Sequence, residues 1–104
     1  MDNKQAVNAM KGKTIRLMGQ ANPNMAAIHI GIIADAFVDN FVSWRNSIRN
    51  WGYNNATTIN IHAKYLTMKE LIISFGVETN DLKEQAQAVM EATDSVPNIG
   101  FAMK

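Results

Sequence analysis

The sequence predicts an all-α fold: a small four-helix domain built on an antiparallel helical hairpin, with its two arms at about 23–51 and 56–75. Apolar residues recur every three or four positions through both arms, which is the period of an amphipathic helix. A turn cluster, Gly52-Tyr53-Asn54-Asn55, separates the arms. A connection this short places consecutive helices side by side and antiparallel.

The first helix is expected over residues 3–18, where side chains of one helical face are apolar or small; they are Ala6, Val7, Met10, Thr14, Leu17 and Met18. Gly19 is expected to end this helix. Asn22 is then expected to cap the second helix, with Pro23 at the first helical position, where a missing N–H leaves no hydrogen bond unmade.

The first arm of the hairpin carries the strongest pattern. Its large apolar residues fall within a sector of about 80° on a helical wheel. We call this stripe the seam, and it consists of Ile30, Ile33, Phe37, Phe41, Trp44, Ile48 and Trp51. Before residue 43 the opposite face is apolar too, so this half is expected to be buried on two sides or to contact another subunit.

The second arm repeats the same stepping at Ile61, Tyr65, Met68, Ile72 and Phe75. Trp44 and Ile48 are therefore expected to pack against Tyr65, Met68 or Ile72. A competing interpretation makes residues 57–65 a strand, because polar and β-branched apolar residues alternate there. The long helix is favoured because its stepping matches that of the first arm.

A fourth helix is expected over residues 80–93, after a stop at Gly76. Its apolar stripe is Leu82, Ala86, Val89 and Met90. The tail from residue 98 to residue 104 contains three further large apolar side chains, Ile99, Phe101 and Met103. Such a tail is expected to fold back onto the bundle or to dock on a neighbour.

Composition indicates one soluble domain spanning residues 1–104, because 47% of the residues are hydrophobic and only 18% are charged. The chain has no cysteine, which excludes thiolate metal sites and a cysteine nucleophile. Met1 to Gln5 are polar, and His29 and Asp35 interrupt the apolar run at 25–38. We therefore expect a cytoplasmic protein without a membrane span.

Residue patterns typical of enzymes are missing from the sequence. His29 and His62 are the only histidines, and neither has a second ligand at helical spacing. Asp35 and Asp39 lie one turn apart on one face, but such pairs more often form polar surface than an acid–base site. The chain is therefore predicted not to be an enzyme, with no catalytic residue, metal or cofactor.

The favoured function is that of a small helical protein that binds a protein partner and forms homo-oligomers. Surplus apolar surface supports this, because large exposed apolar patches usually mark contacts. The expected contact residues are Ile28, Ile32, Val38, Val42, Ile99 and Phe101. A composition rich in asparagine, isoleucine and lysine suggests a phage or mobile-element modulator or structural component.

Two alternatives involve nucleic acid, a less favoured partner. Residues 68–93 have the spacing of a helix-turn-helix DNA-binding regulator, but the acidic residues of the second helix would repel phosphates. The segment from Trp44 to Tyr53 instead combines aromatic and basic side chains, which suit a nucleotide or nucleic acid. The predicted binding residues are Arg45, Arg49 and Tyr53 of this segment, together with Lys64 of the second arm.

Overall fold

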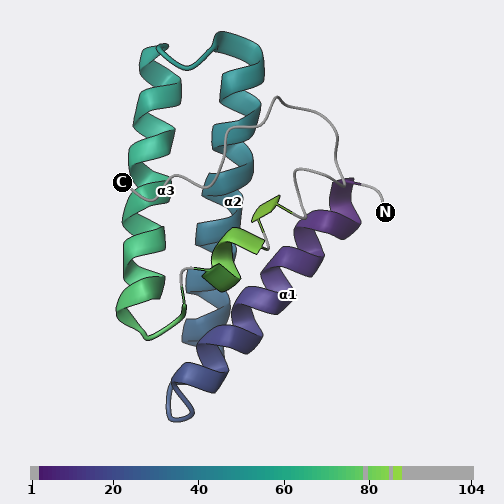
Figure 1. Ribbon diagram of the computed structural model, residues 1–104, viewed down its shortest axis with the longest axis vertical. Coiled ribbons are helices and arrows are strands. Elements are labelled where there is room, and N and C mark those ends of the chain that lie inside the picture. Colours follow the sequence, from purple (N-terminus) through teal and green to yellow (C-terminus); the bar gives the residue numbers. More distant parts are fainter. Residues whose placement is uncertain (1–2, 79, 85, 88–104) are drawn as a thin grey trace.

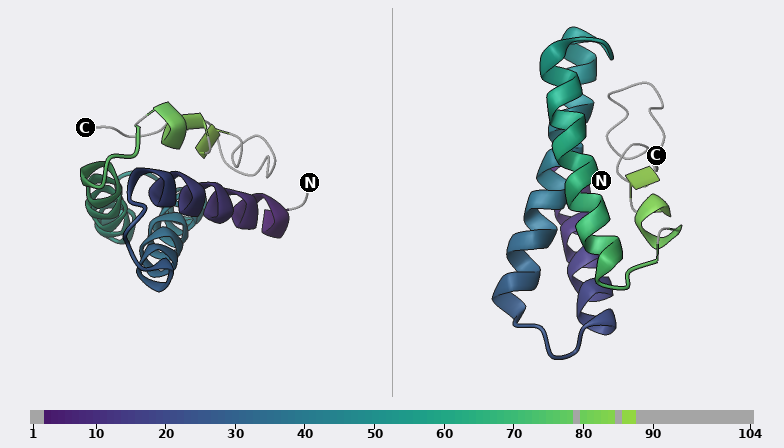
Figure 2. Two further views of the ribbon diagram at one scale, coloured as in Figure 1. Left: turned by 90° about the horizontal axis from the view of Figure 1, so that it is seen from below. Right: turned by 90° about the vertical axis from the view of Figure 1, so that its left-hand side faces the viewer.

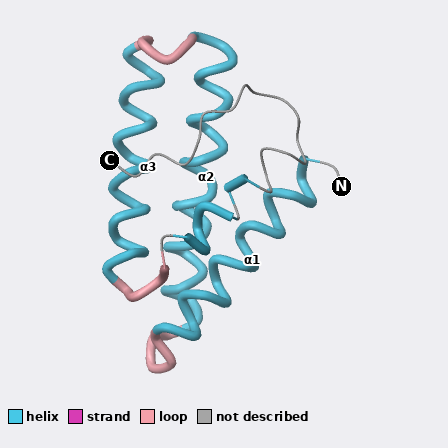
Figure 3. The backbone as a smooth tube through the Cα atoms, viewed as in Figure 1, coloured by secondary structure: helices cyan, strands magenta, loops and turns pink. Residues whose placement is uncertain are grey.

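The computed structural model describes residues 3–78, 80–84 and 86–87, and three long helices account for most of them. They are α1 (Asn3–Ala21), α2 (Ala27–Trp51) and α3 (Ala56–Ser74) (Figure 1). Residues 80–84 and 86–87 are also helical, and the described residues contain no strand (Figure 3). The all-α prediction is confirmed. Residues 88–93 of the predicted fourth helix lie outside the described part of the chain.

α2 and α3 lie side by side and antiparallel, and α1 packs across the lower half of α2 at an angle (Figures 1 and 2). Residues 57–65 belong to α3, so the strand interpretation is wrong. The local reason is the cap, because the Asn55 side chain accepts a hydrogen bond of 2.8 Å from the Thr57 N–H. The turn between α2 and α3 extends beyond the N-terminal end of α1 (Figure 1).

Tyr65 is the centre of the contact between α2 and α3. Its ring centroid lies 5.6 Å from those of Phe37 and Phe41 and 5.3 Å from that of Trp44. Ile48 and Ile72 are buried in the same cluster. The seam therefore packs as predicted from Ile30 to Ile48, with aromatic rings at the separations that favour stacking.

The link between α1 and α2 differs from the prediction. α1 continues past Gly19 to Ala21, and α2 begins at Ala27, so Pro23 lies in the intervening turn. Asn22 caps no helix start. Its Nδ2 donates hydrogen bonds of 3.1 Å to the Met18 carbonyl and 2.7 Å to the Phe75 carbonyl. This amide therefore satisfies carbonyls at the ends of two helices, a use that its position in the sequence does not reveal.

Two glycines end helices as predicted. Gly52 has a φ of 82° and donates its N–H to the Ile48 carbonyl, and Gly76 has a φ of 96° and donates to the Ile73 carbonyl. Both adopt a backbone conformation that other residues rarely populate.

Trp51 is 55% exposed, so its prediction as a core residue is wrong. Trp44 stacks on His62, and each step forward along α2 corresponds to one step back along α3. Residue 51 therefore lies opposite residue 55, in the turn. No helix among the described residues faces the seam at that level, and the indole is exposed.

α2 is long and apolar enough to cross a membrane by length and composition alone. This is weak evidence, because core helices of soluble proteins pass the same test. α2 has buried residues along most of its length and contacts both α1 and α3. The absence of a membrane span stays a prediction.

Candidate functional site

The four predicted binding residues divide between the interior and the surface. Arg45 is buried, with 2% of its surface exposed, whereas Arg49, Tyr53 and Lys64 are exposed. Burial lowers the pKa of Arg45, and the neighbouring charge of Arg49 lowers it further. The structure thus leaves three of the four side chains accessible, Arg49 and Tyr53 close to the α2–α3 turn and Lys64 at the middle of α3.

A buried polar group lies beside the aromatic core. The His62 ring stacks on Trp44 at 4.2 Å between centroids, and Lys69 and Tyr65 are buried on the same helix. Burial raises the pKa of Tyr65 far above its ordinary value and lowers that of Lys69. Sequence reasoning missed Lys69 here. Its spacing of four residues from Tyr65 was the available signal.

Among the described residues, the His62 Nε2 atom is buried without a hydrogen-bond partner. Burial, followed by the charge of Lys69, lowers the pKa of His62 from its ordinary value of 6.5. The unfolded chain therefore takes up a proton at a higher pH than the folded chain does.

We expect the free energy of unfolding to be highest above about pH 6.5 and to fall as the pH drops from there toward the lowered pKa of His62. Urea unfolding at a series of pH values measures this fall. His62→Gln should remove it, and the exposed His29→Gln control should retain it. The same pH dependence in wild type and His62→Gln would contradict the assignment.

Two aromatic side chains and one basic side chain are exposed where α2 turns into α3. Trp51 and Tyr53 are 55% and 52% exposed, and the exposed Arg49 precedes Trp51 by two residues in the last turn of α2. We call these three residues the hairpin tip. The sequence from 40 to 69 contains no acidic residue, so no carboxylate of this stretch opposes the charge of Arg49.

A second exposed surface lies on the first half of α2. Ile28 and Ile32 are one turn apart and are 69% and 62% exposed. Asp35 and Asp39 continue this face, and Asp39 forms an ion pair of 2.9 Å with Lys11 of α1. We call Ile28, Ile32, Asp35 and Asp39 the α2 outer face.

The other predicted contact residues are placed differently. Val38 is fully buried in the same cluster as Met10 and Met18 of α1, and Val42 is partly buried against that cluster. Val38 is therefore covered by its own chain. Ile99 and Phe101 lie outside the described residues.

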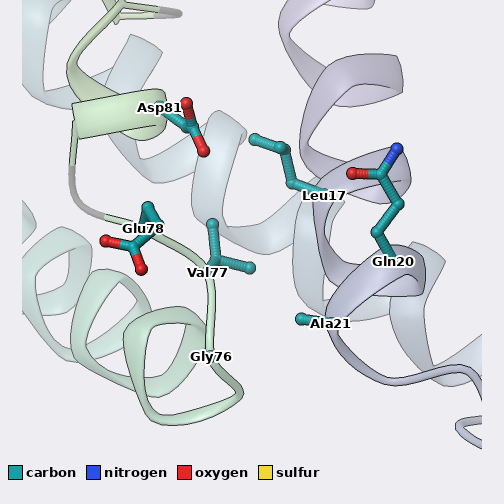
Figure 4. A pocket seen from close by; sticks show the side chains of 7 residues that line it. All are labelled: Leu17, Gln20, Ala21, Gly76, Val77, Glu78 and Asp81. Atoms are coloured by element: carbon teal, nitrogen blue, oxygen red, sulfur yellow. The ribbon is translucent and has the colours of Figure 1, made fainter.

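A pocket of about 260 Å³ lies between the end of α1 and the segment that follows α3 (Figure 4). Its lining consists of Leu17, Gln20, Ala21, Gly76, Val77, Glu78 and Asp81. The carboxylates of Glu78 and Asp81 are on one side, and Leu17 and Gln20 are on the other. We call this the base pocket, because it lies at the end of the molecule opposite the hairpin tip.

Within the part of the chain that the structure describes, no three histidine or acidic side chains come together as a metal site. The absence of a metal, a cofactor and catalytic residues stays a prediction. The helix-turn-helix alternative gains no basic surface. Among the described residues at the start of its second helix, the exposed Lys83 lies next to the exposed Glu84. The exposed Glu78 precedes this helix.

Comparisons with protein-family models, curated proteins and solved structures find no significant match to this chain. Its function is therefore inferred from the exposed surfaces described above.

Proposed function

We propose that the protein is a non-enzymatic, protein-binding assembly protein that associates with copies of itself through the α2 outer face. The observation that carries this proposal is the exposure of Ile28 and Ile32, which are 69% and 62% accessible at adjacent turns of one helix. Single exposed apolar residues are common. Two large ones at adjacent turns of one face form a patch, and covering that patch lowers the free energy.

A second copy fits this face in an antiparallel arrangement about a two-fold axis. In a two-fold contact the same patch lies on both sides, so Ile28 of one copy would meet Ile32 of the other. The axis then passes near residue 30. With a rise of about 1.5 Å per residue, the two Asp35 side chains would be about 15 Å apart along the helices. The isoleucines are thus covered without bringing carboxylates together.

α1 extends the patch. Lys11 reaches Asp39, and Ile15 follows Lys11 by one turn. Residues four apart in a helix share a face, so Ile15 lies toward the α2 outer face. Ile15 is itself 38% exposed. The proposed contact therefore includes apolar side chains from two helices.

The double variant Ile28→Glu and Ile32→Glu tests this contact. Like charges would face each other across the two-fold axis, so we expect dimer affinity to fall by about 100-fold or more. Sedimentation equilibrium measures the mass, and circular dichroism should show unchanged helix content because both positions are exposed.

Ser43→Glu and Asn46→Glu form the matched control. They add the same two charges to exposed positions of α2, beyond the proposed contact. Their mass should equal that of the wild type. An Ile28 and Ile32 variant that dimerises as strongly as this control would refute the proposed contact.

A further inference from the structure

The two ends of the molecule have complementary chemistry. We infer that the hairpin tip of one copy docks into the base pocket of another, making a second, head-to-tail contact. This inference rests on the proposed self-association and names a separate surface for it. The tip and the pocket share no residue with the α2 outer face.

The base pocket selects for an apolar side chain with a hydrogen-bond donor. Leu17, Ala21 and Val77 give it apolar walls. Asp81 turns a carboxylate toward Leu17, where it can accept a hydrogen bond, and Glu78 adds a second negative charge at the exposed rim (Figure 4). A fitting occupant therefore has an aromatic or aliphatic body, a donor at its edge and a positive charge close by.

The hairpin tip provides all three features within five residues. Trp51 carries an indole N–H and Tyr53 carries a phenol O–H, and both rings are more than half exposed. Arg49 adds the positive charge. Tryptophan, tyrosine and arginine are also the side chains that contribute most to protein interfaces.

A hairpin tip that occupies the pocket must come from a second copy, because the tip and the base pocket lie at opposite ends of the same chain (Figure 1). A head-to-tail contact uses two different surfaces, so a docked pair still presents one free tip and one free pocket. The contact therefore repeats, and it produces chains or rings rather than a closed dimer.

The test is made in the Ile28→Glu and Ile32→Glu background, where the two-fold contact is removed. The full-length background chain should still associate at high micromolar concentration. Added salt should weaken that association, because exposed charges are screened. Adding Arg49→Glu, or Glu78→Lys together with Asp81→Lys, should weaken it by about tenfold or more. Circular dichroism checks that each variant is folded.

Mixing two charge-neutralised variants provides the sharpest readout, because reversed charges on tip and pocket would attract each other. The Arg49→Gln chain keeps an intact pocket, and the Glu78→Gln and Asp81→Asn chain keeps an intact tip. Only one productive contact is then available, so an equimolar mixture should form pairs with one copy of each and nothing larger. Tyr53→Ala in the chain with the intact tip should weaken these pairs.

The outcomes separate the two proposals. A background chain that stays monomeric, while the wild type dimerises, overturns the head-to-tail contact and leaves the α2 outer face standing. Association of the background chain that Arg49→Glu leaves unchanged also overturns it. If the background matches the wild type and Arg49→Glu abolishes association, the head-to-tail contact stands and the α2 outer face is wrong.

Discussion

Phe41→Ala is expected to lower the free energy of unfolding by about 3–5 kcal/mol. Phe41 is fully buried, and its ring centroid lies 5.6 Å from that of Tyr65 and 6.4 Å from that of Trp44. Truncation would leave a cavity at the centre of the α2–α3 contact. The surrounding rings are large and rigid, so they can fill it only in part.

Urea unfolding followed by circular dichroism measures this loss. Ile59→Ala is the matched control, because Ile59 lies on the same hairpin but is 56% exposed. Its effect should stay within about 0.5 kcal/mol. Equal effects of Phe41→Ala and Ile59→Ala would show that the seam is not the core of the hairpin.

Val38→Glu is expected to unfold the protein or to destabilise it by about 3–5 kcal/mol or more. Val38 is fully buried, in the core cluster that also contains Met10 and Met18 of α1. A carboxylate there loses its hydration without gaining a partner of opposite charge among those side chains. A domain of this size has a total stability of roughly 5–15 kcal/mol, so the change removes much of it.

Ile32→Glu is the control for this variant, because it introduces the same charge on the same helix at a position that is 62% exposed. It should keep the helix content of the wild type. Its melting temperature should fall only by the amount that dimer formation contributes to that of the wild type. Thermal melts of both variants make the comparison. A Val38→Glu chain that melts like Ile32→Glu would contradict the burial of Val38 in the core.

The hairpin could be predicted from the sequence because one regular pattern determines it. Phe37, Phe41 and Trp44 keep helical spacing, and Tyr65 repeats that spacing on α3. A stripe of this kind must be covered, and a four-residue turn allows only the neighbouring helix to cover it. The glycines that end α2 and α3 follow from the same logic, because their positive φ values are local requirements.

Positions near the ends of elements could not be predicted, because their surroundings depend on where the facing helix stops. Trp51 continues the seam but lies opposite the turn, so it is exposed. Arg45 looked like surface because of its charge, although it is buried. Asn22 has the chemistry of a helix cap, yet its partners include Phe75, which is 53 positions away in the sequence.

The predicted contact residues show the same limit. Val38 was grouped with Ile28 and Ile32 on the back of the helix. At 100° per residue, however, Val38 lies about 80° from Ile28 and about 120° from Ile32. Val38 is buried in the core cluster that includes Met10 and Met18 of α1, whereas Ile28 and Ile32 are exposed. The helical spacing of α2 alone does not show which of its faces the rest of the protein covers.

Sedimentation equilibrium of the wild-type chain tests the proposed self-association most directly. The measurement should run from low to high micromolar concentration, in salt high enough to screen the charged ends of the molecule. The mass is predicted to rise with concentration from 11.5 kDa toward twice that value. A mass that stays at 11.5 kDa throughout the high micromolar range would contradict the proposal.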